Sequence, residues 1–175
     1  MDILTGLGFA REVVMGPVTK FIASQDVGFF TALSLLFESY IFTLLPIPLL
    51  FFYKHINRKK IASLVLSLFF MYILVTSLKS IFQQSRPCNE YLKMDCPLDY
   101  SFPSGHTTVA FAFVFFSLGT MAFPFYYISA FLIAISRIYL GIHSLNDVVG
   151  GVVVGMFSYF ISEKVVEACL RYVGG

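Results

Sequence analysis

Long apolar runs dominate this sequence of 175 residues, in which hydrophobic residues make up 58% and charged residues only 13%. A helix needs about 20 mainly apolar residues to cross a hydrocarbon core about 30 Å thick. Backbone in lipid must satisfy its own hydrogen bonds, and the runs lack the strict alternation of a transmembrane β-strand. We therefore predict a single domain, residues 1–175, that is an all-α polytopic membrane helical bundle with five transmembrane helices. The expected spans are residues 29–53, 61–82, 104–123, 124–140 and 147–170.

The first 25 residues differ from these runs because charged and helix-breaking residues interrupt their apolar positions. The interrupting residues are Arg11, Glu12, Gly16, Pro17 and Lys20. This pattern favours an N-terminal amphipathic helix, residues 1–25, that lies in the membrane interface. A sixth, kinked span is the alternative interpretation.

The charges of the connecting loops predict the orientation in the membrane. The link at residues 54–60 holds four Lys or Arg residues, whereas the loop at residues 83–103 mixes both signs. Lys and Arg concentrate in short cytoplasmic loops. We therefore expect a multi-pass protein of the cell membrane with the 54–60 link inside and the 83–103 and 141–146 loops on the extracytoplasmic face.

This topology brings six polar side chains to the outer ends of the last four spans or into the outer loops. A single Lys, Arg or His at such a place usually snorkels to the interface or forms part of a hydrogen-bonded wall. Six on one face favour a functional site instead. They are Lys79, Arg86, His106, Arg137, His143 and Asp147.

Three of these side chains are cations, so the predicted site suits an anion. Lys79, Arg86 and Arg137 can neutralise the oxygens of a phosphoryl group, and guanidinium groups match phosphate geometry. Ser104 and Gly105 open the third span, where free backbone N–H groups at a helix start would also bind an anion. Ser104 also fits a helix N-cap, and both roles can hold together.

The two histidines can divide the steps of phosphoryl transfer. His143 and Asp147 are four residues apart, so on one helical face the carboxylate can fix one ring nitrogen and leave the other free to attack phosphorus. We predict His143 as the nucleophile, Asp147 as its partner, and His106 as the general acid that protonates the leaving oxygen.

These residues form three motifs that resemble the signature of the type 2 phosphatidic acid phosphatase family, also called lipid phosphate phosphatases. That family shares its site with vanadium haloperoxidases and bacterial acid phosphatases. The resemblance implies a helical bundle, a metal-independent phosphohistidine mechanism, inhibition by vanadate, and the residue roles given above. Many bacterial lipid members look like six-span proteins, whereas five spans are clear in this chain. The motifs are Lys79-(six residues)-Arg86-Pro87, then Pro103-Ser104-Gly105-His106, then Ser136-Arg137-(five residues)-His143-(three residues)-Asp147.

Asp147 is the only acid inside the motifs, so we expect no metal and no cofactor, because hard divalent ions need several oxygen ligands. Glu90, Asp95 and Asp99 lack regular ligand spacing and are interpreted as solvated loop charges. A net charge of +2, spread among apolar runs, argues against nucleic acid as a partner.

The expected partners are membrane lipids and an amphiphilic lipid phosphate or diphosphate. By resemblance to small prokaryotic members, a polyprenyl (undecaprenyl-type) diphosphate ranks first, and phosphatidic acid or phosphatidylglycerophosphate second. A lipid phosphotransferase could use the same residues, and an anion transporter is the alternative from a different class. The sequence does not define the oligomeric state.

Glu38 lies within the first expected span, where an ionisable group is costly. It either forms hydrogen bonds to a neighbouring helix or serves in substrate access. Cys88 and Cys96 share the outer loop and could form a disulfide on an oxidising side, which spacing alone leaves open. Cys169 is expected to be a free thiol.

Overall fold

The computed structural model describes residues 15–52, 56–88 and 91–173, and this part of the chain is helical without any strand. This confirms the all-α class. The helices are α2 (Pro17–Ser24), α3 (Gly28–Leu44), α4 (Ile47–Phe52), α5 (Arg58–Phe82), α6 (Gly105–Ser117), α7 (Phe123–Tyr139) and α8 (Leu145–Val173).

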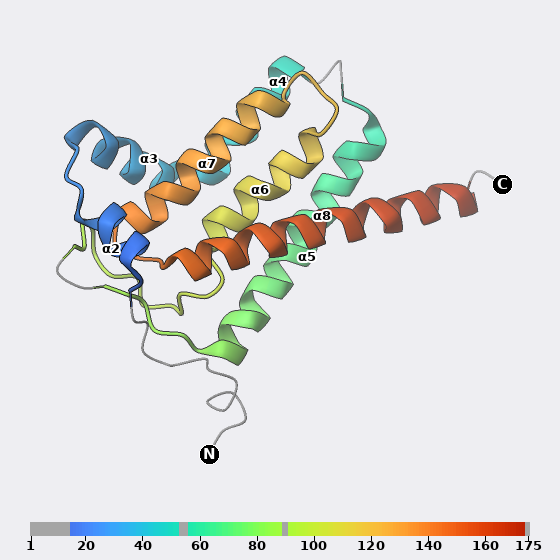
Figure 1. The fold of residues 1–175 in the computed structure, drawn as a ribbon. Helices are drawn as coiled ribbons and strands as arrows, with labels where there is room; N and C mark the ends of the chain where they lie inside the picture. The colour runs from blue at the N-terminus through green and yellow to red at the C-terminus, as the bar shows by residue number, and fades with distance from the viewer. Residues whose placement is uncertain (1–14, 53–55, 89–90, 174–175) are drawn as a thin grey trace.

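Helix α6 is the centre of the bundle and packs against α5, α7 and α8 (Figure 1). Most of its residues are buried, including Ala110, Phe113 and Phe116. Phe113 and Phe116 contact the buried ring of Tyr126 on α7. A helix that is apolar on all sides belongs inside a bundle, so α6 forms the core on which the other helices are arranged.

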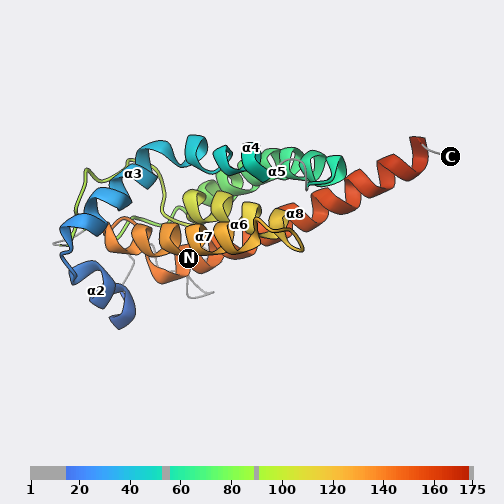
Figure 2. The ribbon, with the colours of Figure 1, turned by 90° about the horizontal axis from the view of Figure 1, so that it is seen from above.

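Two helices, α5 and α8, are each long and apolar enough to cross a membrane. The C-terminal part of α8 extends beyond the other helices (Figures 1 and 2). The expected third span, residues 104–123, forms a shorter apolar helix of 13 residues, whereas the expected fourth span, residues 124–140, corresponds to α7 and has the same length of 17 residues. Helix α6 is shorter because Gly119 adopts a left-handed φ of +72° in the connection and Pro124 lies in the first turn of the next helix.

The expected first span, residues 29–53, is not one helix. It is divided into α3 and α4 at Leu45 and Pro46, because proline has no N–H to continue the helical hydrogen bonds and its ring clashes with the preceding turn. Helices α2 and α3 are bent by 107° relative to each other, and together they could form a third, broken span. The described helices therefore supply two or three spans by length and composition, and the count of five is not confirmed.

The N-terminal prediction is tested only in part. Residues 17–24 do form a helix, α2, which packs on α7 and buries Thr19 and Ala23 while Phe21 stays exposed. Residues 1–14 lie outside the described residues.

Glycines allow α8 to lie directly against α6. A Cβ atom on Gly151 would come within 2.7 Å of the Ser104 carbonyl oxygen, and one on Gly155 within 2.5 Å of the Thr108 carbonyl oxygen. Real Cβ atoms do not approach so closely. The absence of side chains at these two positions therefore sets the spacing between α6 and α8, and both helices begin at the predicted site.

Hydrogen bonds fasten the 83–104 loop to the start of α8 and the end of α7. The Ser104 N–H donates to the Asp147 carbonyl at 3.0 Å, and the Ser101 N–H donates to the Gln84 carbonyl at 2.9 Å. Lys93 donates to the Tyr139 carbonyl at 3.1 Å and lies over the Tyr139 ring. The loop is thus held in place over the ends of three helices.

Candidate active site

A cavity of about 480 Å³ opens between α3, α5, α6 and the loops that precede α6 and α8. Five of the eight predicted site residues line it: Lys79, Arg86, Gly105, His106 and His143. They come from two helices and two loops that are far apart in the sequence. Ser104, Arg137 and Asp147 are fully buried behind the wall. Both histidines therefore face the same cavity.

His143 lies in the short loop between α7 and α8, and its partners define its tautomer. Nε2 lies 3.0 Å from Nη1 of Arg86, and Nδ1 lies 3.4 Å from Oδ2 of Asp147. A guanidinium can only donate hydrogen bonds, so Nε2 must accept and must carry the lone pair. Nδ1 then carries the hydrogen and directs it toward the carboxylate. The ring nitrogen that carries the lone pair is therefore Nε2.

Asp147 is fully buried and is held by donors on several sides. Oδ2 accepts the Ser144 backbone N–H at 2.7 Å, and Oδ1 accepts from Nε2 of Gln84 at 3.0 Å and from the Ser101 hydroxyl at 3.4 Å. The Ser144 hydroxyl accepts the Asp147 N–H at 3.4 Å in return. This reciprocal pair is a capping box at the start of α8. The cap that starts the helix therefore also fixes the partner of His143.

Burial is the main cause that lowers the pKa of His143, to about 4. Arg86 and Lys79 lower it further, whereas Asp147 acts in the opposite direction. The imidazole is consequently neutral near pH 7. A neutral ring is the form that a nucleophile requires, and its Nε2 lone pair accepts the hydrogen bond from Arg86.

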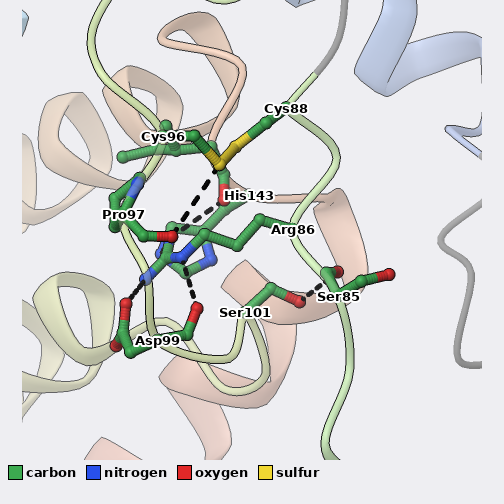
Figure 3. Close-up of a disulfide and its surroundings, with 9 residues drawn as sticks. Ser85, Arg86, Cys88, Cys96, Pro97, Asp99, Ser101 and His143 are labelled. Carbon is green, nitrogen blue, oxygen red and sulfur yellow. Dashed lines mark hydrogen bonds and ion pairs between the residues drawn. A yellow bond between two sulfur atoms is a disulfide. The ribbon is translucent and has the colours of Figure 1, made fainter.

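Lys79 and Arg86 both contact the carboxylate of Asp99, and Figure 3 shows the contact with Arg86. Lys79 Nζ lies 2.6 Å from Oδ2, and Arg86 Nη2 lies 2.6 Å from Oδ1. Arg86 also donates through Nε to the Asp99 carbonyl and through Nη1 to the Ile142 carbonyl, each at 3.0 Å. Asp99 is exposed, as its interpretation as a solvated loop charge implies, but the sequence did not predict that two cations of the site bind it.

These two cations keep Asp99 ionised. Partial burial would raise the pKa of the carboxyl, but the hydrogen bonds from Lys79 and Arg86 outweigh it and lower the pKa to about 2. Asp95, four residues earlier, is exposed as expected. Glu90 lies outside the described residues.

Ser104 is the N-cap of α6, as the sequence predicts. Its hydroxyl oxygen accepts the Thr107 N–H at 3.5 Å and the Thr107 hydroxyl at 3.0 Å. Gly105 begins the helix at the cavity wall, and the nearest atom to a Cβ there would be Val75 Cγ1 at 3.9 Å. The first turn of α6 is thus presented to the cavity without a side chain in front of it.

Arg137 contacts Glu38 rather than the cavity. Its Nη1 donates to Oε2 of Glu38, and its Nη2 donates to the Ser34 carbonyl at 3.0 Å. Oε2 of Glu38 is also 3.6 Å from Nε2 of His106, which lies 3.3 Å from the Glu38 carbonyl. The prediction that Glu38 bonds to a neighbouring helix is confirmed, and one carboxylate joins α3 to both α6 and α7.

Cys88 and Cys96 form a disulfide with a Cα–Cα distance of 5.9 Å, directly beside Arg86 and Asp99 (Figure 3). It closes the loop between these two residues and thereby limits how far Arg86 and Asp99 can separate. Cys169 is a free, exposed thiol, as expected. Within the described ranges, no three His, Cys, Asp or Glu side chains are grouped so that they could hold a metal ion.

Sequence reasoning missed four residues of the site: Gln84, Asp99, Ser101 and Ser144. The Ser-x-x-Asp spacing of Ser144 and Asp147 could have predicted the role of Ser144, because it is the pattern of a capping box. Gln84, Asp99 and Ser101 carry no such signal. They reach the site only because the 83–104 loop folds back on itself, as the bond from Ser101 N–H to the Gln84 carbonyl shows.

Comparison with known proteins agrees with this geometry. The PAP2 superfamily matches residues 60–170. An undecaprenyl-diphosphatase of Sulfolobus acidocaldarius is 30% identical over 128 residues, which are 69% of this chain and 62% of that protein. The match therefore spans less than two thirds of that relative's length.

Solved structures share the fold. The crystal structure of LpxE from Aquifex aeolicus has a TM-score of 0.66 and 31% identity, and the match covers 84% of this chain and 93% of that one. The transmembrane PAP2 type phosphatidylglycerolphosphate phosphatase from Bacillus subtilis has a TM-score of 0.63 at 20% identity, with coverage of 96% and 88%. The second likeness supports the fold alone. Since the family match covers more than half of the chain and contains all three motifs, the chain belongs to the PAP2 superfamily of phosphatases.

Proposed function

We propose that this protein is a membrane lipid phosphatase that hydrolyses a lipid phosphate or diphosphate through a phosphohistidine on His143. The observation that carries the proposal is the hydrogen bonding of His143. Asp147 lies on the Nδ1 side, and the Nε2 lone pair lies beside Arg86 in a cavity that Lys79 and His106 also line. A nucleophile, two cations and a second imidazole thus surround one space.

In the first step, Nε2 of His143 attacks phosphorus and the bond from phosphorus to the lipid oxygen breaks. His106 gives its proton to that oxygen, and the lipid product leaves. In the second step, His106 takes a proton from water, whose oxygen attacks the phosphohistidine and breaks the P–N bond. Inorganic phosphate leaves, and one water is consumed in each cycle. Lys79 and Arg86, together with the N–H groups at Gly105, would bind the phosphoryl oxygens throughout.

The shape of the cavity supports a lipid substrate. Its polar end holds the cations and histidines, and its remaining wall is apolar, with Phe42 from α3, Met71 and Val75 from α5, and Val109 from α6. Tyr72 also lines it and is largely exposed on α5. A volume of about 480 Å³ suits a headgroup and the first part of a chain. The rest of the chain would stay in the bilayer along α5.

Among lipids, we rank an undecaprenyl-type diphosphate first and phosphatidic acid or phosphatidylglycerophosphate second. The relative that is named an undecaprenyl-diphosphatase supports this order. The two cations that line the cavity, Lys79 and Arg86, would suit a headgroup with more than one negative charge. The order is tested by incubating purified protein in detergent and EDTA with each lipid and ranking the release of inorganic phosphate.

We also propose that the site faces the extracytoplasmic side. Lys79 is near the C-terminal end of α5, whereas Arg58 and Lys59 begin it, and a helix of 25 residues is about 37 Å long. The site and the basic, inward-facing residues are therefore at opposite ends of one helix. The disulfide beside Arg86 is typical of an oxidising compartment.

Two variants test the mechanism and assign the two histidines separately. His143→Asn should abolish phosphate release from every substrate, because no nucleophile remains. His106→Asn should abolish release from phosphatidic acid. With p-nitrophenyl phosphate it should still release a burst of nitrophenolate, which leaves without a proton, and then accumulate the phosphohistidine, because no base activates water. Acid-labile labelling of the protein by ³²P-labelled p-nitrophenyl phosphate should therefore persist in His106→Asn and be lost in His143→Asn. The proposal fails if the wild type releases no phosphate from any lipid, or if His143→Asn stays active.

A further inference from the structure

A carboxylate of the chain itself binds the two cations that face the cavity. Each oxygen of Asp99 binds one cation, Lys79 at one and Arg86 at the other, both at 2.6 Å. The cations are nearly buried, with exposed side-chain fractions of 14% and 7%, whereas that of Asp99 is 57%. Asp99 therefore lies at the mouth of the cavity and covers the cations from the solvent side.

We propose that Asp99 is a specificity-determining residue, which excludes the singly charged phosphodiester headgroups of bulk phospholipids from the phosphoryl site. The inference rests on the proposed function, because it concerns the selection of substrates by that site. A lipid phosphatase meets phosphodiester lipids in large excess over its substrate. To discriminate against phosphodiester lipids, the site needs a group that opposes their binding, in addition to contacts that favour the substrate.

Replacement of the Asp99 carboxylate by a lipid phosphate at Lys79 and Arg86 provides this discrimination. Asp99 carries one negative charge and is tethered beside both cations, so it competes as an intramolecular ligand at high effective concentration. A phosphodiester also carries one charge, and its binding would only replace one monoanion with another. A phosphate monoester carries about 1.5 to 2 negative charges near pH 7. The monoester therefore gains additional attraction from the two cations when it displaces the carboxylate.

Asp99 is free to make way for a substrate. Its exposed side chain can turn into solvent while the loop itself stays fastened by the disulfide at Cys96 and by the Ser101 N–H on Gln84. Displacement therefore requires the rotation of one side chain and no rearrangement of the cavity wall.

The test uses Asp99→Asn, which keeps the shape and one acceptor oxygen but removes the charge. Phosphatidylglycerol, a singly charged phosphodiester, is titrated as an inhibitor of phosphate release in mixed micelles. We expect its inhibition constant to fall about tenfold or more in Asp99→Asn, because the hydrogen bonds of the competing carboxylate to two charged groups are lost. The KM for a phosphate monoester lipid should fall by a smaller factor.

Two further variants show whether the effect of Asp99→Asn comes from the lost charge of Asp99 or from a general change in the loop. Asp95→Asn makes the same charge change on an exposed residue of the same loop and should leave the inhibition constant unchanged. Asp99→Glu keeps the charge and should retain the exclusion of phosphatidylglycerol. Equal inhibition of the wild type and Asp99→Asn would overturn the inference, and so would weaker binding of both lipids to Asp99→Asn.

The inference can be tested even if no lipid is hydrolysed. Binding of orthovanadate to the purified protein is then measured by calorimetry, with the same four proteins. Tighter binding to Asp99→Asn than to wild type, with Asp95→Asn unchanged, supports competition by Asp99. Equal binding to all four rejects it. Absence of phosphate release from wild-type protein would count against the proposed function only.

Discussion

At the scale of single residues, His143 has a protonation state that its surroundings fix. Burial with Arg86 and Lys79 holds its pKa at about 4, although Asp147 favours the charged ring. We expect the ring ¹⁵N signals of His143 in histidine-labelled, substrate-free protein to titrate near pH 4, with the signal assigned by its loss in His143→Asn. A midpoint above pH 6 would contradict this account.

The same pKa predicts how stability depends on pH. Below about pH 6.5 the unfolded chain binds a proton at His143, whereas the folded chain does so only near pH 4. More protons are therefore bound in the unfolded state between these values, so the free energy of unfolding should rise with pH across this window. Thermal unfolding in detergent should show a smaller rise between pH 4 and 6.5 for His143→Asn than for the wild type.

Asp147 should be the most sensitive of the buried polar residues. In Asp147→Asn, an NH₂ group replaces one carboxylate oxygen. Its N–H groups would then face the donors of Gln84, Ser144 or His143, each of which needs an acceptor. We expect kcat to fall on the order of 10³- to 10⁴-fold, as when the carboxylate behind a catalytic imidazole is lost. Ser101→Ala removes one weaker donor and is the matched control, with a much smaller effect. Comparable losses in both variants would argue against an orienting role for Asp147.

At the scale of elements, the contact between α6 and α8 positions the two histidine-bearing segments. Gly151→Ala would place a Cβ atom 2.7 Å from the Ser104 carbonyl oxygen, which is backbone and cannot turn aside. We expect a loss of about 1–3 kcal/mol of stability from overpacking, measured by thermal unfolding in detergent, together with reduced kcat. Gly28→Ala meets nothing within 4 Å and is the control. Equal stability of the two variants would show that α6 and α8 can separate without strain.

At the scale of the whole molecule, the two long helices have the site at one end and basic residues at the other. Lys79 and Asp147 belong to the site end of α5 and α8, whereas Lys59 pairs with Glu167 at 3.5 Å near the far end of both. This ion pair shows that the ends of the two helices remote from the site also meet.

This arrangement predicts the accessibility of the cysteines in intact cells. Cys169 is exposed near the C-terminal end of α8, so a membrane-impermeant maleimide should label it only after the membrane is permeabilised. Cys88 and Cys96 should become labelled in intact cells once an impermeant reductant has been added. Labelling of Cys169 in intact cells, without permeabilisation, would reverse the proposed orientation.

Much of this protein follows from its sequence alone. The excess of apolar residues and the lack of alternation determine an all-helical membrane protein, because backbone in lipid must pair with itself. The order and spacing of the three motifs determine the family, which the match over residues 60–170 confirms, and they predict five of the residues that line the cavity. The Ser104 cap could also be predicted, since capping depends only on neighbours along the chain.

Tertiary structure decided where helices stop and what each charge contacts. The division of the expected first span at Pro46 and the early end of α6 depend on local backbone and on packing, which hydropathy does not describe. The pairing of Asp99 with Lys79 and Arg86, and of Glu38 with Arg137, joins residues 13 to 99 positions apart. A charge pair depends on distance in space, and only the folded chain fixes that distance.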